Sequence, residues 1–242
     1  MFFHYKTQGL FLKKEDRGDA DQLFTIYTKD FGKLEILAKA IRKISSKLRA
    51  GAEIFYLSDI EFIQAKRNKT LTDAVPIEKF KNLKKDLNRL KAAYQISEVS
   101  DSLIRGQEPD EKIWELFIDV FKKLNNLHFL SENLQLIYYY FLWNFLSLLG
   151  YQLEIYNCAV CGKKMIPEKI YFNPRGGGTI CKNCAKAVKN AKELRSETVK
   201  IIRIIIKKDW KLLSKIKIEP SHLKSLELIS KSYLNYVSSM VK

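Results

Sequence analysis

Along the first 75 residues, hydrophobic and polar positions alternate with the two-residue period that is typical of β-strands. The short segment 29–33 contains a glycine and separates two such runs, as the loop of a hairpin does. Strands are expected at Phe3–Leu12, Leu23–Thr28, Leu34–Ala38, Glu53–Leu57 and Asp59–Ile63. Four or five short strands in this space predict a small closed barrel without exposed edges, and the five-stranded OB-fold is the leading candidate.

Near Pro76 the hydrophobic spacing changes to three and four residues, which is the period of an α-helix. The apolar stripe of the first helix is expected to consist of Ile77, Phe80, Leu83, Leu87, Leu90 and Tyr94. Pro109, Asp110 and Glu111 form a typical helix start before 113–124, because acidic side chains stabilise a first turn. Further helices are expected at 196–206 and 221–240. The pattern predicts an α+β chain, with a barrel domain at 1–76 and an all-helical domain at 77–242.

One apolar stretch, from Asn133 to Leu153, contains no charged residue. A membrane-spanning helix needs about 20 predominantly apolar residues. Five Asn, Gln and Ser residues interrupt this stretch, and Gly150 ends its apolar run. We therefore expect a buried central helix, and no association with a membrane.

All four cysteines of the chain lie in two Cys-x-x-Cys pairs that are separated by nineteen residues. This spacing is typical of a zinc site in which the four thiolates of Cys158, Cys161, Cys181 and Cys184 complete a tetrahedron. Such a site is structural, because no coordination position is left for a catalytic water. Disulfides suit small secreted domains, and a redox pair normally occurs singly near a βαβ pattern. We therefore predict a Zn²⁺ module at about 155–188, inserted in the helical domain, and a reducing, cytoplasmic location.

The net charge of +16 is concentrated in one part of the chain. Residues 1–75 carry 14 Lys and Arg against 10 Asp and Glu, residues 76–162 carry 10 against 11, and residues 163–242 carry 19 against 6. A concentrated basic surplus favours a polyanionic partner, either nucleic acid or an anionic surface, over a merely solvated lysine-rich surface.

The segment Lys39–Arg49, called the basic loop below, holds five cations and no acid between two expected strands. Basic loops on an OB-fold neutralise phosphates without reading bases. The alternative is a solvated connector. The basic loop is therefore the strongest candidate for ligand contact.

No catalytic signature is found in the chain, and we expect it not to be an enzyme. Glu15, Asp16, Asp19 and Asp21 form an acidic cluster whose spacing matches no EF-hand loop, so a solvated turn is favoured over a Mg²⁺ site. The glycines at 176–178 follow Arg175 and lack the ending of a phosphate-binding loop, so a turn between the cysteine pairs is favoured.

Several segments, in this order and spacing, resemble the bacterial recombination-mediator family RecO over nearly the whole chain. They are Lys6–Leu10, Arg17–Leu23, Thr25–Lys33, Lys39–Arg49, Phe62–Ile63 with Thr70–Ala74, and Phe172–Cys181. Members of that family have an N-terminal OB-fold, a helical domain and, in many cases, a four-cysteine zinc site. Many of them carry glycine where this chain has Ala40.

The resemblance implies a DNA repair protein of the RecF pathway, located at the nucleoid, that binds single- and double-stranded DNA and anneals complementary strands. It also implies that the protein acts with RecR in loading RecA onto DNA coated by single-stranded-DNA-binding protein (SSB). The acidic SSB tail is a further expected partner, and the basic C-terminal helices are a reasonable place for it. The implied DNA contacts are Lys39, Arg42, Lys43, Lys47 and Arg49, with Lys13, Lys14 and Arg17 as weaker additions.

Two other functions stay open on the sequence. A zinc-ribbon and OB-fold protein can instead bind RNA or the ribosome. A metal-dependent nuclease would use the acidic cluster near Asp19.

Overall fold

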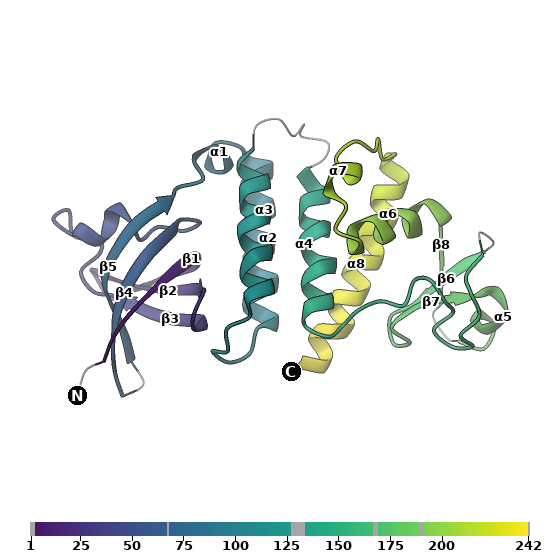
Figure 1. Ribbon diagram of the computed structural model, residues 1–242, viewed down its shortest axis with the longest axis horizontal. Coiled ribbons are helices and arrows are strands. Elements are labelled where there is room, and N and C mark those ends of the chain that lie inside the picture. The colour runs from purple at the N-terminus through teal and green to yellow at the C-terminus, as the bar shows by residue number, and fades with distance from the viewer. Residues whose placement is uncertain (1–2, 67, 127–133, 167–168, 189–190, 242) are drawn as a thin grey trace. The chain divides into compact units, whose positions relative to one another are not determined.

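The computed structural model describes residues 3–66, 68–126, 134–166, 169–188 and 191–241. Its internal contacts divide the chain into two compact units, Met1–Leu134 and Gln135–Lys242. In the N-terminal unit the strands precede the helices, as the sequence pattern predicts (Figure 1).

The N-terminal unit begins with a five-stranded sheet that closes on itself as a barrel in the order β1-β2-β3-β5-β4. Its strands are β1 (Phe3–Arg17), β2 (Asp21–Thr28), β3 (Gly32–Ala38), β4 (Leu57–Ala65) and β5 (Asn68–Glu78). Strand β1 pairs with both β2 and β4, and a parallel contact between Leu37 of β3 and Thr70 of β5 completes the closure.

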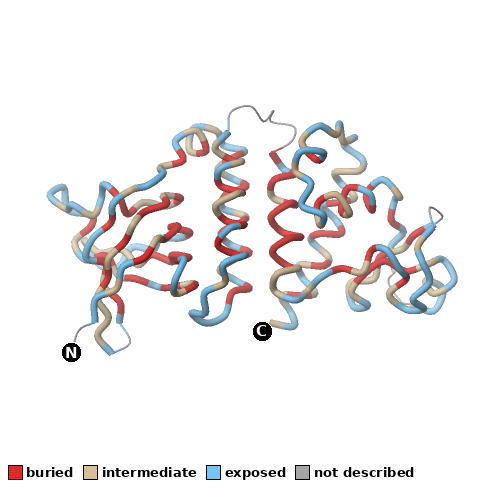
Figure 2. The backbone as a smooth tube through the Cα atoms, in the orientation of Figure 1, coloured by how far each residue is buried: buried red, intermediate tan, exposed pale blue. Residues whose placement is uncertain are grey.

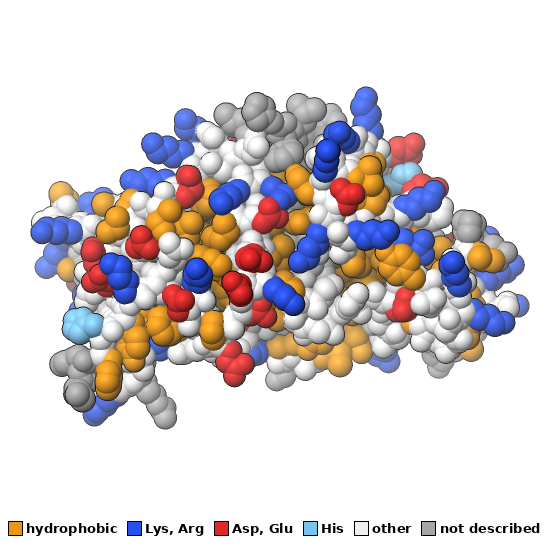
Figure 3. Space-filling model, viewed as in Figure 1, with side chains coloured by type: hydrophobic (Ala, Val, Ile, Leu, Met, Phe, Trp, Pro, Cys, Tyr) orange, Lys and Arg blue, Asp and Glu red, His pale blue; other side chains and the backbone are white. Residues whose placement is uncertain are grey.

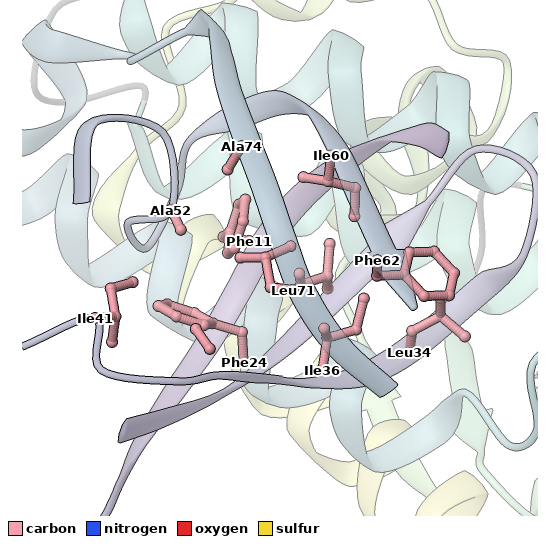
Figure 4. Packing of buried hydrophobic residues seen from close by; sticks show 12 residues of the cluster. Phe11, Phe24, Leu34, Ile36, Ile41, Ala52, Ile60, Phe62, Leu71 and Ala74 are labelled. Carbon is pink, nitrogen blue, oxygen red and sulfur yellow. The ribbon is translucent and has the colours of Figure 1, made fainter. Parts of the chain in front are cut away.

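The interior of the barrel is filled by alternate side chains of its strands, because successive residues of a strand point to opposite faces. Phe24 and Ile26 of β2 pair with Ile36 and Leu34 of β3, and all four side chains are buried. Figure 4 shows Phe24, Leu34 and Ile36 in this core. Phe11 meets Phe24 edge-on, with ring centroids 5.0 Å apart. The core explains the two-residue hydrophobic period of this part of the sequence.

The prediction of a strand at Glu53–Leu57 is wrong, since β4 begins only at Leu57. Phe55 has a φ of 62°, which no strand residue adopts, and its buried ring packs against Tyr94 and Phe121. Phe55 is therefore apolar because it packs against α2 and α3, and not because it belongs to a strand.

Strand β5 was not predicted, and the helical pattern does not start at Ile77 as expected. Pro76 and Ile77 belong to β5. Most of the strand is polar, with Leu71 and Ala74 its only members of the barrel core among the described residues, so its sequence carries little strand pattern. Asp86 then caps the next long helix by accepting from the N–H groups of Asn88 and Arg89.

Three helices follow the barrel in the same unit: α1 (Lys81–Lys84), α2 (Leu87–Leu103) and α3 (Glu111–Asn125). The predicted start of α3 is confirmed, because Asp110 accepts from the N–H of Ile113. The predicted apolar stripe is wrong for α2, where Leu87 is 84% and Tyr94 43% exposed. The predicted stripe combined residues of β5, of the segment before α2 and of α2 itself. Because these residues do not belong to one helix, they do not lie on one helical face.

Helices α2 and α3 pack on the barrel. Tyr27 of β2 lies against Phe117 of α3 and donates to the carbonyl of Asp110 at 3.3 Å. Lys33 of β3 bonds the backbone and the carboxylate of Asp101 at the end of α2. The secondary structure therefore changes near residue 78, whereas the first compact unit extends to residue 134.

The C-terminal unit is built around α4 (Leu134–Leu148), which is buried along most of its length (Figure 2). Asn144 in α4 donates to the carbonyls of Tyr140 and Ile205, so its buried amide is satisfied. Around α4 lie α6 (Ser196–Ile206), α7 (Trp210–Leu213) and α8 (Pro220–Val241). Helices α6 and α8 confirm the predicted helices at 196–206 and 221–240, whereas α7 was not predicted. Among the described residues no helix is long and apolar enough to span a membrane.

The same unit contains a small sheet that the prediction of an all-helical domain missed. It consists of β6 (Ile170–Asn173), β7 (Gly178–Cys181) and β8 (Lys192–Leu194), and the short helix α5 (Lys182–Ala185) follows β7. Gly178 is required there, because a Cβ would lie 2.2 Å from the carbonyl oxygen of Glu154. Gly176 and Gly177 lie in a turn between the two cysteine pairs, as predicted, and Gly178 begins β7.

Candidate functional site

A groove of about 1180 Å³ lies on the outer surface of the barrel. One wall is the β1–β2 turn at Arg17 and Gly18, and another is the β4–β5 turn at Ala65 and Asn68. Its floor includes outward residues of β2 and β3. Gly106 and Gln107, between α2 and α3, close one end of the groove.

Lys69 on β5 lines the groove and is only 9% exposed. In the described part of the chain it forms no ion pair. Its stem is packed away from water, but its Nζ is not among the fully buried polar atoms of the described residues, so an anion in the groove can reach the ammonium group. Lys39 and Arg17 also line the groove, whereas the charge of Lys33 is offset by Asp101 at 3.1 Å. The lining also includes the carboxylates of Asp21 and Glu35, so cations outnumber acids by four to two and the groove suits an anionic ligand.

The basic loop starts at the groove and passes through turns to a short 3-10 helix at Lys47–Ala50. Its backbone is held in place, because the N–H of Ala40 donates to Asp21 at 2.7 Å and the N–H of Arg42 to Ala20 at 3.0 Å. Ile41 and Ala52 belong to the barrel core. The loop is thus an anchored part of the barrel.

The cations of the basic loop are exposed. Arg42 pairs with Asp16 at 3.5 Å. The other four, Lys39, Lys43, Lys47 and Arg49, form no ion pair with any described residue. Figure 3 shows acidic side chains interleaved with basic ones over the barrel unit. The four unpaired cations of the basic loop therefore differ from most of this surface.

Ala40 has a φ of 53°, the left-handed conformation that favours glycine. We expect Ala40→Gly to stabilise the protein by about 0.5–1 kcal/mol, because the relief of about 1–2 kcal/mol of strain exceeds the extra chain entropy of glycine. The melting temperature should rise by about 2–4 °C in a thermal unfolding scan. Ala50→Gly is the matched control in the same loop; since the φ of Ala50 is not positive, it should lower stability, and equal effects would contradict the strain.

The three weaker candidates all take part in surface ion pairs. Lys13 pairs with Glu15 at 3.0 Å, Lys14 with Glu53 at 2.6 Å, and Arg17 with Glu15 at 3.2 Å. The hydrogen bond to Glu15 is the main cause that raises the pKa of Lys13. Exposed pairs of this kind contribute about 0–1 kcal/mol, so a phosphate can displace the carboxylates.

The acidic cluster is not assembled as a metal site. Asp16 accepts from Gln22 and pairs with Arg42, and Asp21 accepts from Ala40. Throughout the described ranges, the four cysteines are the one group of metal-ligating side chains whose ligand atoms are gathered.

The Sγ atoms of Cys158, Cys161, Cys181 and Cys184 all lie within 4.8 Å of one another. Those of Cys161 and Cys181 are 3.9 Å apart. In a tetrahedral zinc site with Zn–S bonds of about 2.3 Å, sulfur atoms lie roughly 3.8 Å apart. The four thiols therefore fit one four-coordinate metal ion.

The surroundings of the cysteines favour a bound cation. Burial would raise the pKa of Cys158, but backbone N–H donors, first those of Cys161 and Cys181, lower it to about 6. The neighbouring thiol of Cys181 raises the pKa of Cys184 to about 12. Four thiolates cannot crowd together without a compensating positive charge, which a divalent metal supplies.

The cysteine site is attached to the core of its unit at two places. Arg203 of α6 donates to the carbonyl of Ile155 at 2.6 and 3.2 Å and lies over the ring of Tyr156. Phe172 of β6 packs against Tyr233 of α8, with ring centroids 6.1 Å apart. This location suits a structural role.

Sequence reasoning did not identify Lys69, nor the part of the groove at Gly106 and Gln107. A signal for Lys69 was present, because Lys66, Arg67 and Lys69 form a basic run between the segments Phe62–Ile63 and Thr70–Ala74. Gly106 and Gln107 carry no signal in the sequence, since only the packing of α2 and α3 brings them to the barrel.

Two family models match the chain almost from end to end. The model described as Recombination protein O N terminal matches residues 1–80, and that described as Recombination protein O C terminal matches residues 84–240. The boundary between them lies where the strands give way to helices.

The chain is also similar to several curated proteins called DNA repair protein RecO. It is 27% identical over 233 residues to that of Dehalococcoides mccartyi (strain ATCC BAA-2266), covering 96% of this chain and 90% of the relative. For Thermoanaerobacter sp. (strain X514) the identity is 29% over 236 residues, with 95% and 90% covered. For Roseiflexus sp. (strain RS-1) it is 25% over 233 residues, with 96% and 81% covered.

Proposed function

The chain belongs to the recombination protein O family of DNA repair proteins, and from this premise we propose that its barrel is an OB-fold that binds DNA. The strand order β1-β2-β3-β5-β4 and the parallel contact of β3 with β5 support this assignment. OB-folds bind oligonucleotides over strands 2 and 3, between the β1–β2 and β4–β5 loops. The groove lies in that place.

The observation that carries the proposal is the buried, unpaired Lys69 in this groove, next to Arg17 and Lys39. The groove is lined by four cations against the carboxylates of Asp21 and Glu35, and phosphates of a single strand would balance the surplus positive charge. The basic loop continues the cationic surface beyond Lys39 with Lys43, Lys47 and Arg49. These contacts neutralise the backbone and read no base, so both single- and double-stranded DNA are ligands with little sequence preference.

We further propose that the protein anneals complementary strands and acts as a recombination mediator. Two polyanionic strands repel each other, and neutralising phosphates on each lowers the free energy of their encounter while counterions are released. With RecR it would assist the loading of RecA onto SSB-coated single strands. The acidic SSB tail would bind the C-terminal unit, since residues 163–242 carry 19 Lys and Arg against 6 acids.

The cysteines would hold a structural Zn²⁺, for which they supply all four ligands. The metal would bring charge compensation and a cross-link between the two cysteine pairs. The protein would act by binding and not by covalent chemistry.

The proposal is tested by titrating a labelled oligo(dT) with the protein at several salt concentrations and recording fluorescence anisotropy. If the six cations of the groove and basic loop named above and Arg42 contact phosphates, the logarithm of the affinity should fall with that of the salt concentration with a slope of about −5. A nearly flat dependence would contradict it.

Two further arms separate the alternative functions. Structured RNA added as a competitor should displace the oligonucleotide less well than single-stranded DNA does; the reverse order would favour the RNA- or ribosome-binding alternative. Labelled DNA incubated with the protein and Mg²⁺ should stay intact, and metal-dependent cleavage would establish a nuclease.

A further inference from the structure

We propose that the barrel carries a second phosphate-binding site, formed by Lys14, Lys79 and Lys84 around Tyr56, which holds a second DNA strand. The inference rests on the proposed function, because it assumes that the groove binds the first strand. It goes beyond that function by assigning the second strand a place of its own.

The second site is a compact, half-buried cluster that gathers residues from three parts of the N-terminal unit. The Nζ of Lys84, in α1, lies 4.1 Å from the centre of the Tyr56 ring, and that of Lys79 lies 5.5 Å from it. Lys14, in β1, bonds Glu53 at 2.6 Å. The aromatic ring thus holds two ammonium groups close to a third without neutralising any of them.

The cluster has more positive charge than its own residues compensate. Glu53 is the carboxylate that acts on Lys84, and Lys14 already bonds it. Burial is the first cause that lowers the pKa of Lys84, and the positive charges of Lys14 and Lys79 lower it further. A phosphate group bound among the three lysines removes this repulsion.

The cluster and the groove lie at opposite ends of the β4–β5 hairpin. Leu57, the first residue of β4, pairs with Glu78 next to Lys79, whereas Ala65, at the other end, pairs with Asn68 in the groove. Strand β4 has nine residues, and at about 3.3 Å per residue its ends are roughly 26 Å apart. The two sites are therefore separate enough to hold two backbones.

A DNA backbone fits the second site better than an acidic peptide does. Glu53 and Tyr56 lie at the end of the connection that also carries the exposed cations Lys47 and Arg49. An extended backbone with phosphates at regular intervals can reach these cations from the cluster, whereas the first strand reaches the same basic loop from the groove, so the two strands would meet on the loop. A strand held there would lie close to one bound in the groove, which is the arrangement that annealing requires.

The test uses the full chain with Lys79→Glu and Lys84→Glu, which leaves the pair of Lys14 and Glu53 in place. Three quantities are measured: the affinity for one labelled oligo(dT), energy transfer between donor- and acceptor-labelled oligo(dT) bound together, and the rate of annealing of complementary strands. Lys81→Glu with Lys85→Glu is the matched control, because both lysines are exposed in the same segment and lie over no described ring.

We expect the affinity of the Lys79/Lys84 variant for one strand to change less than about threefold, while energy transfer is lost and annealing slows at least tenfold. The control variant should keep its affinity for one strand, the energy transfer and the rate of annealing. The variant Lys79→Gln with Lys84→Gln, checked by thermal unfolding, should show the same loss without reversed charges.

Other outcomes overturn the inference. An equal loss of single-strand affinity and annealing would make the cluster part of one continuous site, and no change in either would leave it a structural contact. Loss of binding to an oligoglutamate peptide with annealing intact would assign it to an acidic protein partner. If the unmodified protein binds one strand but never two, this inference fails alone; if it binds none, the proposed function fails first.

Discussion

Replacing Arg42, Lys43 and Lys47 by glutamate is expected to weaken binding to a single-stranded oligonucleotide by at least about 500-fold at about 50 mM salt. Three phosphate contacts on a single strand contribute about 2 to the slope of log affinity against log salt. Between about 1 M salt, where this contribution vanishes, and about 50 mM salt, a slope of about 2 changes the affinity by about 500-fold. Repulsion by the new carboxylates adds to the loss. The salt slope itself should fall by about 2, which an unrelated loss of folding would not produce.

The variant should remain folded, because the three side chains are exposed and the loop is held by its backbone and by Ile41. Its melting temperature and metal content should match those of the unmodified protein. The matched control is Lys200→Glu, Lys211→Glu and Lys224→Glu, which makes the same change of charge on exposed residues of α6, α7 and α8. This control should lose much less affinity for naked DNA.

The opposite ranking is equally informative. If the loop variant keeps its affinity and the control loses it, the DNA contact lies on the basic C-terminal third. If both lose affinity by similar factors, the protein binds DNA through its general positive charge, and the groove has no special role.

The parts of the fold that the sequence predicted well are those with a local cause. Asp110 precedes α3 and caps it, and α6 begins at the predicted Ser196. The cysteine spacing likewise brought four thiols together, because Cys158 and Cys161 lie on one turn, and Cys181 and Cys184 lie at the start of the short helix α5. Caps, periods and short spacings act within a few residues, so they are visible in the sequence alone.

The parts that were missed depend on contacts between distant residues. β5 is a strand because it pairs with β4 and, through Thr70, with β3, while its own residues are mostly polar. Phe55 looks like a strand residue, and only its contact with α2 and α3 explains its conformation.

The same limit applies to the candidate site. The basic loop was visible as a run of cations, but Lys69 became a candidate only when the barrel buried it without a carboxylate. The cluster around Tyr56 joins β1 to α1, and no spacing in the sequence indicates that Lys14 and Lys84 lie together.

Replacing Cys158 and Cys161 by serine is expected to abolish metal binding and to lower the melting temperature of the C-terminal unit by more than about 10 °C. Binding of structural zinc contributes about 10–16 kcal/mol in small zinc domains. Even a decrease of about 3 kcal/mol in the free energy of unfolding lowers the melting temperature of a domain of about 100 residues by about 10 °C or more. Metal content is measured by elemental analysis, and unfolding by calorimetry and circular dichroism.

The reason for a large effect is the position of the cysteines in their unit. Cys158 is buried, and its sulfur accepts from the N–H of Cys181 at 3.4 Å. Without the metal, the turn between the pairs and the sheet β6–β8 lose their cross-link. The contacts of Ile155 with Arg203 and of Phe172 with Tyr233 then weaken as well. Removal of the metal with a chelator should reproduce the loss in the unmodified protein.

Val160→Ser is the matched control, since Val160 lies between the two replaced cysteines, is 56% exposed and leaves every thiol in place. It should retain the metal and melt within about 1–2 °C of the unmodified protein, as exposed substitutions usually do. Unchanged melting of the cysteine variant would show that the thiols do not hold a structural metal.

DNA binding separates a structural role of the metal from a direct one. The groove and the basic loop lie wholly in the N-terminal unit, so the cysteine variant should bind oligo(dT) within about threefold of normal at temperatures below its unfolding. A selective loss of DNA binding with intact folding would instead place the metal module in the DNA contact. Because residues 163–242 hold most of the net charge, such a result would also make that surface, and not the barrel, the principal site.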